Sequence, residues 1–229
     1  MHQVSIRQEI VDRVVARRGR LRWFDALDAK RTALIVIDMQ DTFCAPGSPA
    51  EVAASRDIVA PINVVAKGLR DRGGKVVFVL HANSQFGERS DWELFFNHVV
   101  DGSVRQKTIE SLSPGHQQVW RGLDRSNDDV TVFKNRYSAL ISNASNLERI
   151  LRNLDIDTVL IAGTKTNVCC ESTARDAMML DFKVVMLSDC CAALSDDEHR
   201  ATLETIIQQF GDVMTGPESL EAMDRGSAA

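Results

Sequence analysis

The chain has 229 residues, of which 44% are hydrophobic and 26% are charged, and these fractions are ordinary for a globular protein. They exclude disorder, a collagen-like repeat and a coiled coil as descriptions of the whole chain. Lys and Arg total 27 against 32 Asp and Glu, a formal charge of −5 that gives no attraction to nucleic acid or an anionic membrane. The longest apolar runs, such as residues 33–37, are far below the ~18 residues of a membrane span. We therefore expect neither a nucleic-acid nor a membrane partner.

Cysteine usage favours a reducing compartment. The five cysteines are an odd number, and four of them form two adjacent pairs; they are Cys44, Cys169, Cys170, Cys190 and Cys191. A secreted disulfide framework has an even, spaced set instead. No CxxC pair or zinc-finger spacing occurs, and residues 1–20 lack the apolar centre of a signal peptide. These features predict a cytoplasmic protein without a metal site.

The predicted elements alternate between short apolar strands and amphipathic helices. A continuous apolar run without alternation, ending in Asp38, predicts a strand at 32–38 that is buried on both faces. Further short apolar segments predict strands at 75–80, 129–134, 158–162, 183–187 and 211–214. Apolar residues at helical spacing predict helices at 5–18, 55–72, 145–153, 168–180 and 196–210. The segment 81–127 is irregular, with one short helix expected near 91–99.

This alternation predicts βαβ units, and hence an α/β fold of three layers in which one doubly wound parallel sheet of about six strands has helices on both faces. We expect an N-terminal helical extension at 1–30, one domain at 31–216 and a C-terminal tail at 217–229. Ligands of such sheets bind beyond the carboxyl ends of the strands, near the point where the strand order reverses. That edge is where reactive residues are sought.

Three reactive side chains stand at predicted strand ends: Asp38 at the end of the first strand, Lys134 at the end of the third, and Cys169 where the fourth leads into a helix. Each alone also has a structural interpretation, as a turn cap, a solvated lysine or a small buried thiol. Together they match the requirements of a cysteine nucleophile. The helix N-terminus and a nearby ammonium favour thiolate, and a carboxylate can accept the thiol proton.

The turn 163–169 (GTKTNVC) adds backbone N–H groups that can stabilise a tetrahedral oxyanion. No histidine is well placed to act as the base, so Asp38 takes that role in this interpretation. His81, at the end of the second strand, either lines the pocket or is a hydrogen-bonded structural residue. The turn lacks both GxGxxG and GxxxxGK[ST], so we expect no nucleotide or other organic cofactor.

Three motifs resemble those of the isochorismatase-like cysteine hydrolases: 38–43 (DMQDTF), 134–138 (KNRYS) and 163–177 (GTKTNVCCESTARDA). The match covers about residues 30–215. The resemblance implies a Rossmann-like, six-stranded parallel sheet and a catalytic triad of Asp38, Lys134 and Cys169. It also implies a cis peptide at Thr164–Lys165, an oxyanion hole of the Lys165 and Cys169 N–H groups, and a homo-oligomer, dimeric or tetrameric, that acts on a small molecule.

Departures within the family narrow the expected activity. Residues 81–87 (HANSQFG) lack the Asp-x-His pattern with which nicotinamidases hold a metal, so no metal is expected. The motifs look most similar to the biuret and ureidoacrylate amidohydrolase branch. Phe43 and Gln209 resemble the pocket phenylalanine and glutamine of biuret hydrolases. The adjacent Gln208 is an alternative for the glutamine, and a solvent-facing position on the helix is an equally open interpretation of Gln209. His81 and Tyr137 are further candidates for substrate binding.

The sequence therefore predicts a cysteine-dependent amidohydrolase that cleaves a C–N bond of a small linear amide or ureido compound. Alternatives are an isochorismatase-type or N-carbamoyl hydrolase, or a non-catalytic binding domain of the same fold. One geometric question stays open. With strand order 3-2-1-4-5-6, Lys134 lies two strands from Asp38, about 10 Å at normal strand spacing, and must lean inward to reach it.

Overall fold

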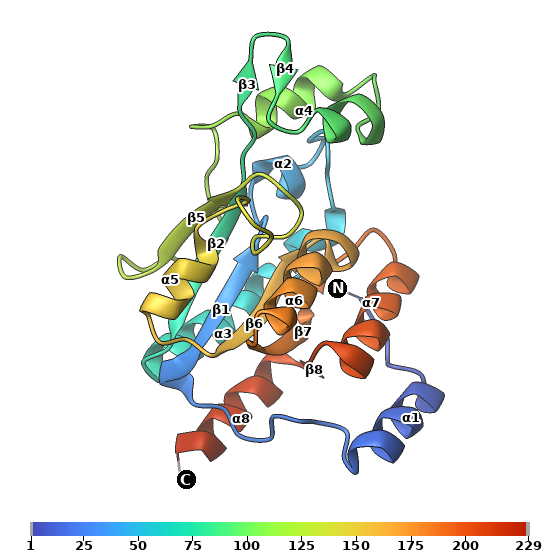
Figure 1. The fold of residues 1–229 in the computed structure, drawn as a ribbon, viewed down its shortest axis with the longest axis vertical. Coiled ribbons are helices and arrows are strands. Elements are labelled where there is room, and N and C mark those ends of the chain that lie inside the picture. The colour runs from blue at the N-terminus through green and yellow to red at the C-terminus, as the bar shows by residue number, and fades with distance from the viewer. Residues whose placement is uncertain (1, 228–229) are drawn as a thin grey trace.

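The computed structural model describes residues 2–227, which form a parallel sheet between two layers of helices (Figure 1). The sheet has six strands in the order β5-β2-β1-β6-β7-β8, and each adjacent pair is parallel. The strands are β1 (Thr32–Ile37), β2 (Lys75–His81), β5 (Val130–Lys134), β6 (Thr158–Thr164), β7 (Lys183–Ala192) and β8 (Asp212–Met214). The predicted fold class and the 3-2-1-4-5-6 strand order are therefore confirmed.

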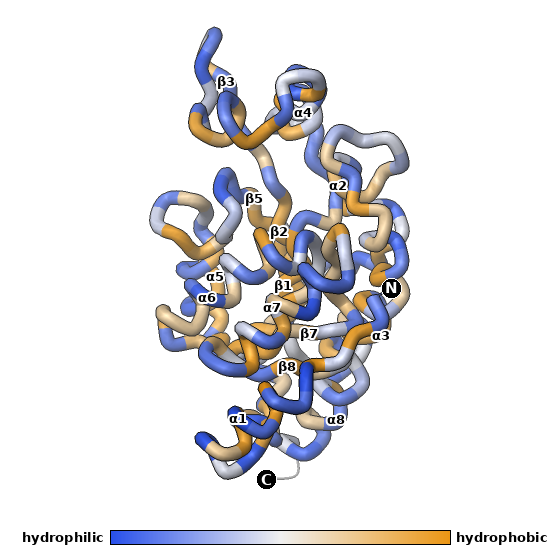
Figure 2. Tube along the Cα trace, turned by 90° about the vertical axis from the view of Figure 1, so that its right-hand side faces the viewer, coloured by the Kyte–Doolittle hydropathy of each residue, from blue (hydrophilic) through white to orange (hydrophobic). Residues whose placement is uncertain are grey.

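Both faces of the sheet are covered, which explains why its strands read as continuous apolar runs. Helices α3 (Val59–Asp71) and α8 (Gly216–Ser227) pack on one face, against residues such as Leu34 and Val36 of β1. Helices α5 (Leu147–Asn153), α6 (Glu171–Met179) and α7 (Asp196–Gln209) pack on the other, against Ile35 and Ile37. Hydrophobic segments accordingly gather at the central strands in Figure 2.

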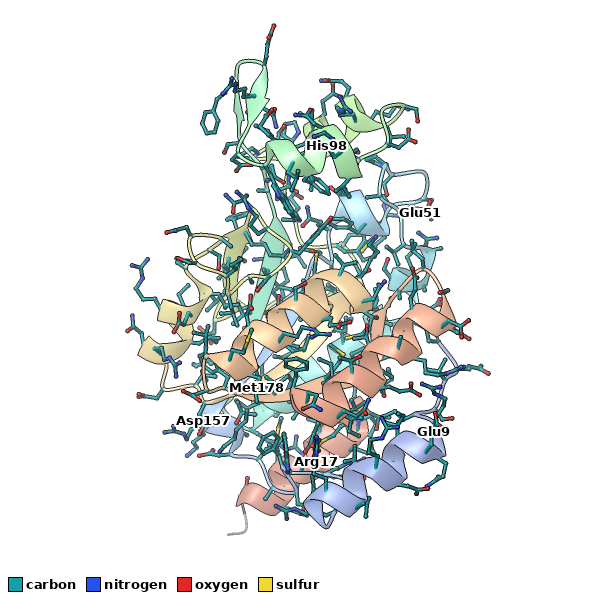
Figure 3. The ribbon with its side chains drawn as sticks, turned by 45° about the vertical axis from the view of Figure 1, so that its right-hand side comes forward. Glu9, Arg17, Glu51, His98, Asp157 and Met178 are labelled. Atoms are coloured by element: carbon teal, nitrogen blue, oxygen red, sulfur yellow. The ribbon has the colours of Figure 1, made fainter. Side chains whose placement is uncertain are left out.

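The two terminal segments pack onto this framework. Helix α1 (Gln8–Arg18) buries Ile10 and Val14 against Ile207 of α7, and Figure 3 shows Glu9 and Arg17 of α1 at the end of the molecule opposite His98. The described part of the expected C-terminal tail is helix α8, whose Met223 belongs to the core on the α3 side. No helix within residues 2–227 combines the length and the apolar character that crossing a bilayer requires.

The irregular segment after β2 forms a cap over the carboxyl ends of the strands (Figure 1). This cap segment, residues 85–112, contains the hairpin β3 (Gln85–Phe86) and β4 (Arg89–Ser90), a π-helical turn at Phe95–Val99 and helix α4 (Arg105–Leu112). The one-turn helix α2 (Asp41–Cys44) lies beneath it and contacts α4. The sequence interpretation placed a short helix at 91–99 and missed α4, because only Thr108 and Leu112 of α4 are buried and no apolar stripe marks it.

Candidate active site

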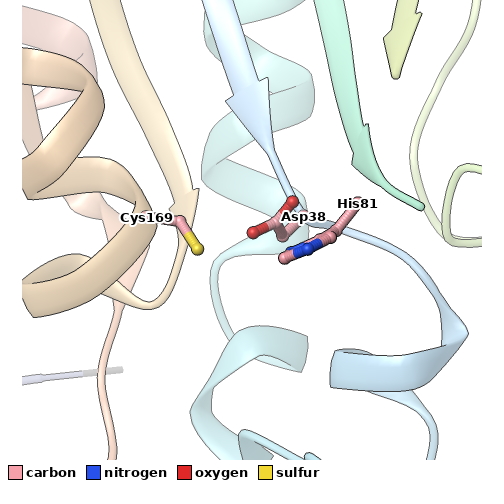
Figure 4. Close-up of side chains that lie close together, drawn as sticks. All are labelled: Asp38, His81 and Cys169. Carbon is pink, nitrogen blue, oxygen red and sulfur yellow. The ribbon is translucent and has the colours of Figure 1, made fainter. Parts of the chain in front are cut away.

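Asp38 begins the site at the carboxyl end of β1. It is fully buried, and its backbone adopts φ 55°, the left-handed region that few residues other than glycine and short polar ones occupy. Its N–H donates to the Val79 carbonyl at 2.8 Å, so the neighbouring strand β2 fixes this turn. Figure 4 shows the Asp38 carboxylate between the His81 ring and the Cys169 sulfur.

Lys134 does reach Asp38. Its side chain is 0% exposed, and its Nζ lies 2.9 Å from Asp38 Oδ2, so the long side chain spans the two-strand gap. The same ammonium also donates to the Arg136 carbonyl at 3.0 Å and contacts His81 Nδ1 at 3.4 Å. An ammonium has three N–H donors, and these three acceptors occupy all of them. Lys134 is thus held as a cation in one position.

His81 is part of this buried cluster. Strand register places it directly opposite Lys134, and it is 2% exposed. Because an ammonium can only donate, His81 Nδ1 must carry its lone pair toward Lys134, which leaves the proton of the neutral ring on Nε2. Burial, reinforced by the charge of Lys134, holds the pKa of His81 well below its ordinary value. The ring is therefore a neutral acceptor for Lys134, a role that the sequence interpretation missed although the strand register encodes it.

Cys169 approaches Asp38 from a turn whose backbone the sequence dictates. Gly163 has φ 115°, and a Cβ there would clash with the backbone of Ile37 in β1, so only glycine fits. A cis peptide joins Thr164 and Lys165, as the resemblance implies, and residues Thr166–Cys170 form a π-helical turn before α6. Cys169 is 5% exposed, and its Sγ, an Asp38 carboxylate oxygen and a His81 ring nitrogen lie within 4.8 Å of one another.

The backbone of the same turn offers a donor. The Lys165 carbonyl accepts from the Val168 and Cys170 N–H groups at 3.1 and 3.2 Å, which fixes the turn. The Lys165 N–H donates to no backbone carbonyl of residues 2–227. This N–H belongs to the turn for which the sequence predicts an oxyanion hole.

The protonation state of Cys169 differs from the one expected from the sequence. Burial and the negative charge of Asp38 raise the pKa of the Cys169 thiol well above its ordinary value. Lys134 lowers this pKa, as expected, but its effect is outweighed, so the expectation of a thiolate favoured at rest is wrong. Burial raises the pKa of Asp38 as well, against the opposing effect of Lys134. Burial alone would lower the pKa of Lys134, but the charge of Asp38, together with that of Cys169 once its thiol is ionised, outweighs burial and raises that pKa. The resting cluster is a thiol beside a carboxylate–ammonium pair.

Asp38, His81 and Cys169 have the ligand types and proximity of a metal site, but their surroundings do not fit a metal ion. The Lys134 ammonium already bonds to Asp38 and contacts His81 at the ring nitrogen with the free lone pair. A metal ion there would have to displace or deprotonate a buried lysine whose pKa is raised. The cluster is organised around an ammonium instead.

A cavity of about 260 Å³ opens above Cys169, a size suited to a small ligand. Its walls come from α2, the cap segment and the 163–170 turn, and they are mostly apolar. They include Phe43, His81, Phe95, Val99, Val100, Asp101, Val104, Leu112, Tyr137, Lys165 and Val168.

The structure brings three of the four predicted substrate-binding residues to this cavity: Phe43, His81 and Tyr137. It does not bring Gln209 there. Gln209 is exposed at the end of α7, and the alternative Gln208 bonds to Arg13 of α1 at 3.0 Å. Helix α7 returns antiparallel to the strands, so its last turn lies at the edge of the sheet opposite the cavity. The expectation that a glutamine of α7 lines the substrate pocket is therefore wrong.

Phe43, His81, Phe95 and Tyr137 line the cavity, and Trp92 packs against three of these rings. The Trp92 and Phe95 rings stack with centroids 4.6 Å apart, and Tyr137 meets Trp92 edge-on at 4.8 Å. The His81 ring lies 5.9 Å from Trp92 and 6.4 Å from Phe43. Trp92 was a candidate for the pocket by its proximity to the motifs, whereas Phe95, also of the cap segment, was not connected to the strand-end residues by its sequence position.

Comparison with known proteins agrees with this arrangement. The isochorismatase domain family matches residues 32–218, which is most of the chain and includes every strand-end residue described above. The chain belongs to the isochorismatase family. This is a family of cysteine hydrolases.

Individual relatives share about a quarter to a third of their residues with this chain, at 25–31% identity. A crystal structure of a cysteine hydrolase from Pseudomonas syringae pv. phaseolicola superposes with a TM-score of 0.74 at 31% identity, covering 90% of this chain and 97% of that one. A protein named as a probable inactive nicotinamidase from Arabidopsis thaliana is 30% identical over 76% of this chain and 87% of its own length. Maleamate amidohydrolase from Pseudomonas putida is 25% identical over 85% and 87%.

Proposed function

We propose that this isochorismatase-family hydrolase is a cysteine-dependent amidohydrolase that cleaves a C–N bond of a small linear amide or ureido compound. The observation that carries the proposal is the closed contact between a buried thiol, a buried carboxylate of raised pKa and a fully bonded lysine ammonium. Asp38, Lys134 and Cys169 are its catalytic residues, and the Lys165 and Cys169 N–H groups form its oxyanion hole.

Acylation begins when Asp38 takes the proton of the Cys169 thiol. This transfer leaves the total charge of the cluster unchanged, because the negative charge moves from oxygen to sulfur beside the same Lys134 ammonium. The thiolate attacks the substrate carbonyl carbon, and the oxyanion accepts hydrogen bonds from the two backbone N–H groups. Protonated Asp38 then donates its proton to the leaving nitrogen as the C–N bond breaks, which releases ammonia or an amine.

Deacylation uses the same groups in reverse. Asp38, again a carboxylate, removes a proton from water, and the oxygen attacks the thioester or carbamoyl-thioester carbon. The C–S bond breaks, and Asp38 returns the proton to sulfur. The products are an acid, or a carbamate from a ureido substrate, and the resting thiol. No step requires a metal or an organic cofactor.

The proposed substrate is biuret-like or ureidoacrylate-like. Support comes from the small cavity, from its flat aromatic side, which suits a planar conjugated amide, and from the likeness of three motifs to that branch. The relative named maleamate amidohydrolase also acts, by its name, on an amide of a small acid. The alternatives of isochorismatase-type hydrolysis and of binding without turnover are outcomes of the test below.

The test measures ammonia release from biuret, ureidoacrylate, N-carbamoyl amino acids, maleamate and nicotinamide, and hydrolysis of isochorismate in parallel. We expect turnover of at least one amide or ureido compound, and Cys169→Ala should lower it on the order of 10⁶-fold, the scale of a lost nucleophile. Cys170→Ala is the matched control, since Cys170 is buried next in sequence but does not line the cavity. Turnover of isochorismate alone, or activity that survives in Cys169→Ala, would overturn the proposal.

A further inference from the structure

We infer that the Lys165 side chain binds a carboxylate of the substrate, so that the enzyme selects amides or ureido compounds carrying a negative charge. This inference rests on the proposed function and deepens it by naming the substrate class. It separates the two substrate types proposed above, because ureidoacrylate carries a carboxylate whereas biuret is neutral. Binding a carboxylate requires a cation at the cavity that has free hydrogen-bond donors.

Lys134 has none. Its three donors go to Asp38, to the Arg136 carbonyl and to His81, and its side chain is 0% exposed. A substrate carboxylate could reach Lys134 only by displacing Asp38, which the proposed mechanism needs as the base. At the base of the cavity, the Lys134 ammonium and the Asp38 carboxylate are therefore already paired with each other before a substrate binds.

Two other basic groups near the cavity are also excluded. The Arg136 guanidinium donates to the Asn135 and Asp91 carbonyls at 2.7 and 2.9 Å and lies 5.1 Å from the centre of the Trp92 ring. His81 is neutral because burial lowers its pKa, so it offers no charge to an anion. Arg136 keeps free N–H donors but does not line the cavity, and His81 carries no charge, so neither group is placed to pair with a substrate carboxylate there.

Lys165 is different. It lines the cavity, and within the 163–170 turn its neighbours Thr164 and Thr166 are both 0% exposed while Lys165 is partly exposed. Among residues 2–227, no acceptor lies within hydrogen-bond or ion-pair distance of its Nζ. Lys165 is thus a cavity-lining residue whose ammonium has no partner, beside walls that are mainly apolar, where a charge pair is stronger than at the open surface.

The acidic residue of the cavity does not neutralise this charge. Asp101 is exposed at the rim, and its Oδ1 accepts from the Ser103 N–H at 2.8 Å and from the Ser103 hydroxyl at 2.5 Å. It forms no ion pair with Lys165. Asp101 therefore acts as a cap of its own turn, and the Lys165 ammonium remains available to a ligand.

The position of Lys165 also defines the shape of the substrate. Its backbone N–H is proposed to bond to the oxyanion at the reacting carbonyl, while its side chain would hold the carboxylate. Both groups of the substrate must then lie within the reach of one lysine residue. A short linear compound with an amide or ureido group at one end and a carboxylate at the other meets this condition.

The experiment compares a dicarboxylic acid monoamide, such as maleamate, with its diamide, in which a neutral amide of similar shape replaces the carboxylate. The wild-type enzyme should prefer the monoamide by roughly 10- to 100-fold in kcat/KM, the scale of a hydrogen bond to a charged group. Lys165→Met should bring this ratio close to 1, and Lys165→Arg should retain most of it. Lys107→Met is the control, because it removes the same charge from the exposed face of α4 and should leave the ratio as in wild type.

Two results would overturn the inference: a wild-type ratio near 1, or a Lys165→Met ratio equal to that of wild type. If no amide is turned over, the proposed function fails, and the charge subsite is then judged by binding alone. Calorimetric titration of Cys169→Ala with maleamate and with maleamide, in the presence and absence of Lys165→Met, gives that answer. A carboxylate preference that Lys165→Met removes supports the subsite, and equal binding of both compounds refutes it.

Discussion

The base of the cavity and its wall are built in opposite ways. At the base, Asp38, Lys134 and His81 stand on the ends of adjacent parallel strands, are at most 2% exposed and contact one another. The wall comes mainly from the cap segment, where Leu94 is 69% and Val99 61% exposed, and His81 is the one residue of the main sheet that lines the cavity within residues 2–227. Strand register fixes the groups that carry out chemistry, whereas short irregular elements shape the space for the substrate.

This difference has a physical reason. A buried ammonium and a buried carboxylate are tolerated only when each is paired and hydrogen-bonded, so the base leaves little freedom for substitution. The wall buries little area and bonds few charged groups, so its side chains can change at small energetic cost. Variants of the base should therefore change the rate of chemistry, and variants of the wall should change substrate affinity.

The largest expected effect at the base is that of Asp38→Asn. The amide cannot accept the thiol proton, so turnover should fall by roughly 10²- to 10⁴-fold. The same change removes the negative charge that raises the pKa of Cys169 and leaves Lys134 as its neighbour, so that pKa should fall. Iodoacetamide should then alkylate Cys169 faster near neutral pH than in the wild-type protein, although turnover is lost.

Asp101→Asn is the matched control at the wall and should alter neither the alkylation rate nor kcat. An Asp38→Asn variant with wild-type turnover would show that another group is the base. Slower alkylation in that variant would contradict the charge balance described for the cluster, because it would mean that Asp38 favours the thiolate.

A tenfold effect is expected at His81, which accepts from Lys134. His81→Phe keeps a planar ring but removes the acceptor, so kcat should fall about tenfold, equivalent to one weakened hydrogen bond. His81→Asn restores an acceptor oxygen near the Nδ1 position and should recover most of that loss. With Lys134 held less firmly, the pKa of Asp38 should rise, and the acid limb of the pH–kcat profile should move to higher pH in His81→Phe only.

Thermal unfolding of both His81 variants separates positioning from stability. If kcat follows the melting temperature and the acid limb does not move, His81 is merely a packing residue. Equal kcat in the Phe and Asn variants would also contradict the proposed acceptor role.

Substitutions in the cavity wall should have the smallest effect on the kinetic constants. Val99→Ala removes apolar contact from an exposed position that lines the cavity, so KM should rise only a few-fold while kcat stays within twofold. The free energy of unfolding should stay within about 0.5 kcal/mol of wild type. Steady-state kinetics and urea unfolding check both values, and a large fall in kcat would show that the wall takes part in chemistry.

Much of the framework could be predicted because its signals are local. Runs such as residues 33–37 are apolar without interruption, since strands buried on both faces have no polar side. The strands stop at Asp38 and Lys134, and the 163–169 turn follows β6, so parallel topology alone gathered these groups at one edge. The structure confirmed the sheet order and brought the three side chains together.

Other features lacked such a signal. Helix α4 has too few buried apolar residues to show a periodic stripe, and the strand assignment stopped at 187 because Ser188 and Asp189 interrupt the apolar run of β7. Gln209 was assigned by resemblance from its place near the end of a helix, yet the direction of α7 carries it to the far edge of the sheet. Its solvent-exposed position could be recognised only once the packing of α7 was known.

The sequence by itself determined the parallel sheet, the order of its motifs and the edge at which Asp38, Lys134 and Cys169 meet, because hydrophobic periodicity and strand direction are encoded residue by residue. The tertiary structure decided how Lys134 crosses two strands, that His81 is its acceptor, that Cys169 rests as a thiol and that Lys165 lines the cavity without an ion-pair partner among residues 2–227. Burial and charge pairing arise between residues far apart in the chain, so no local pattern contains them.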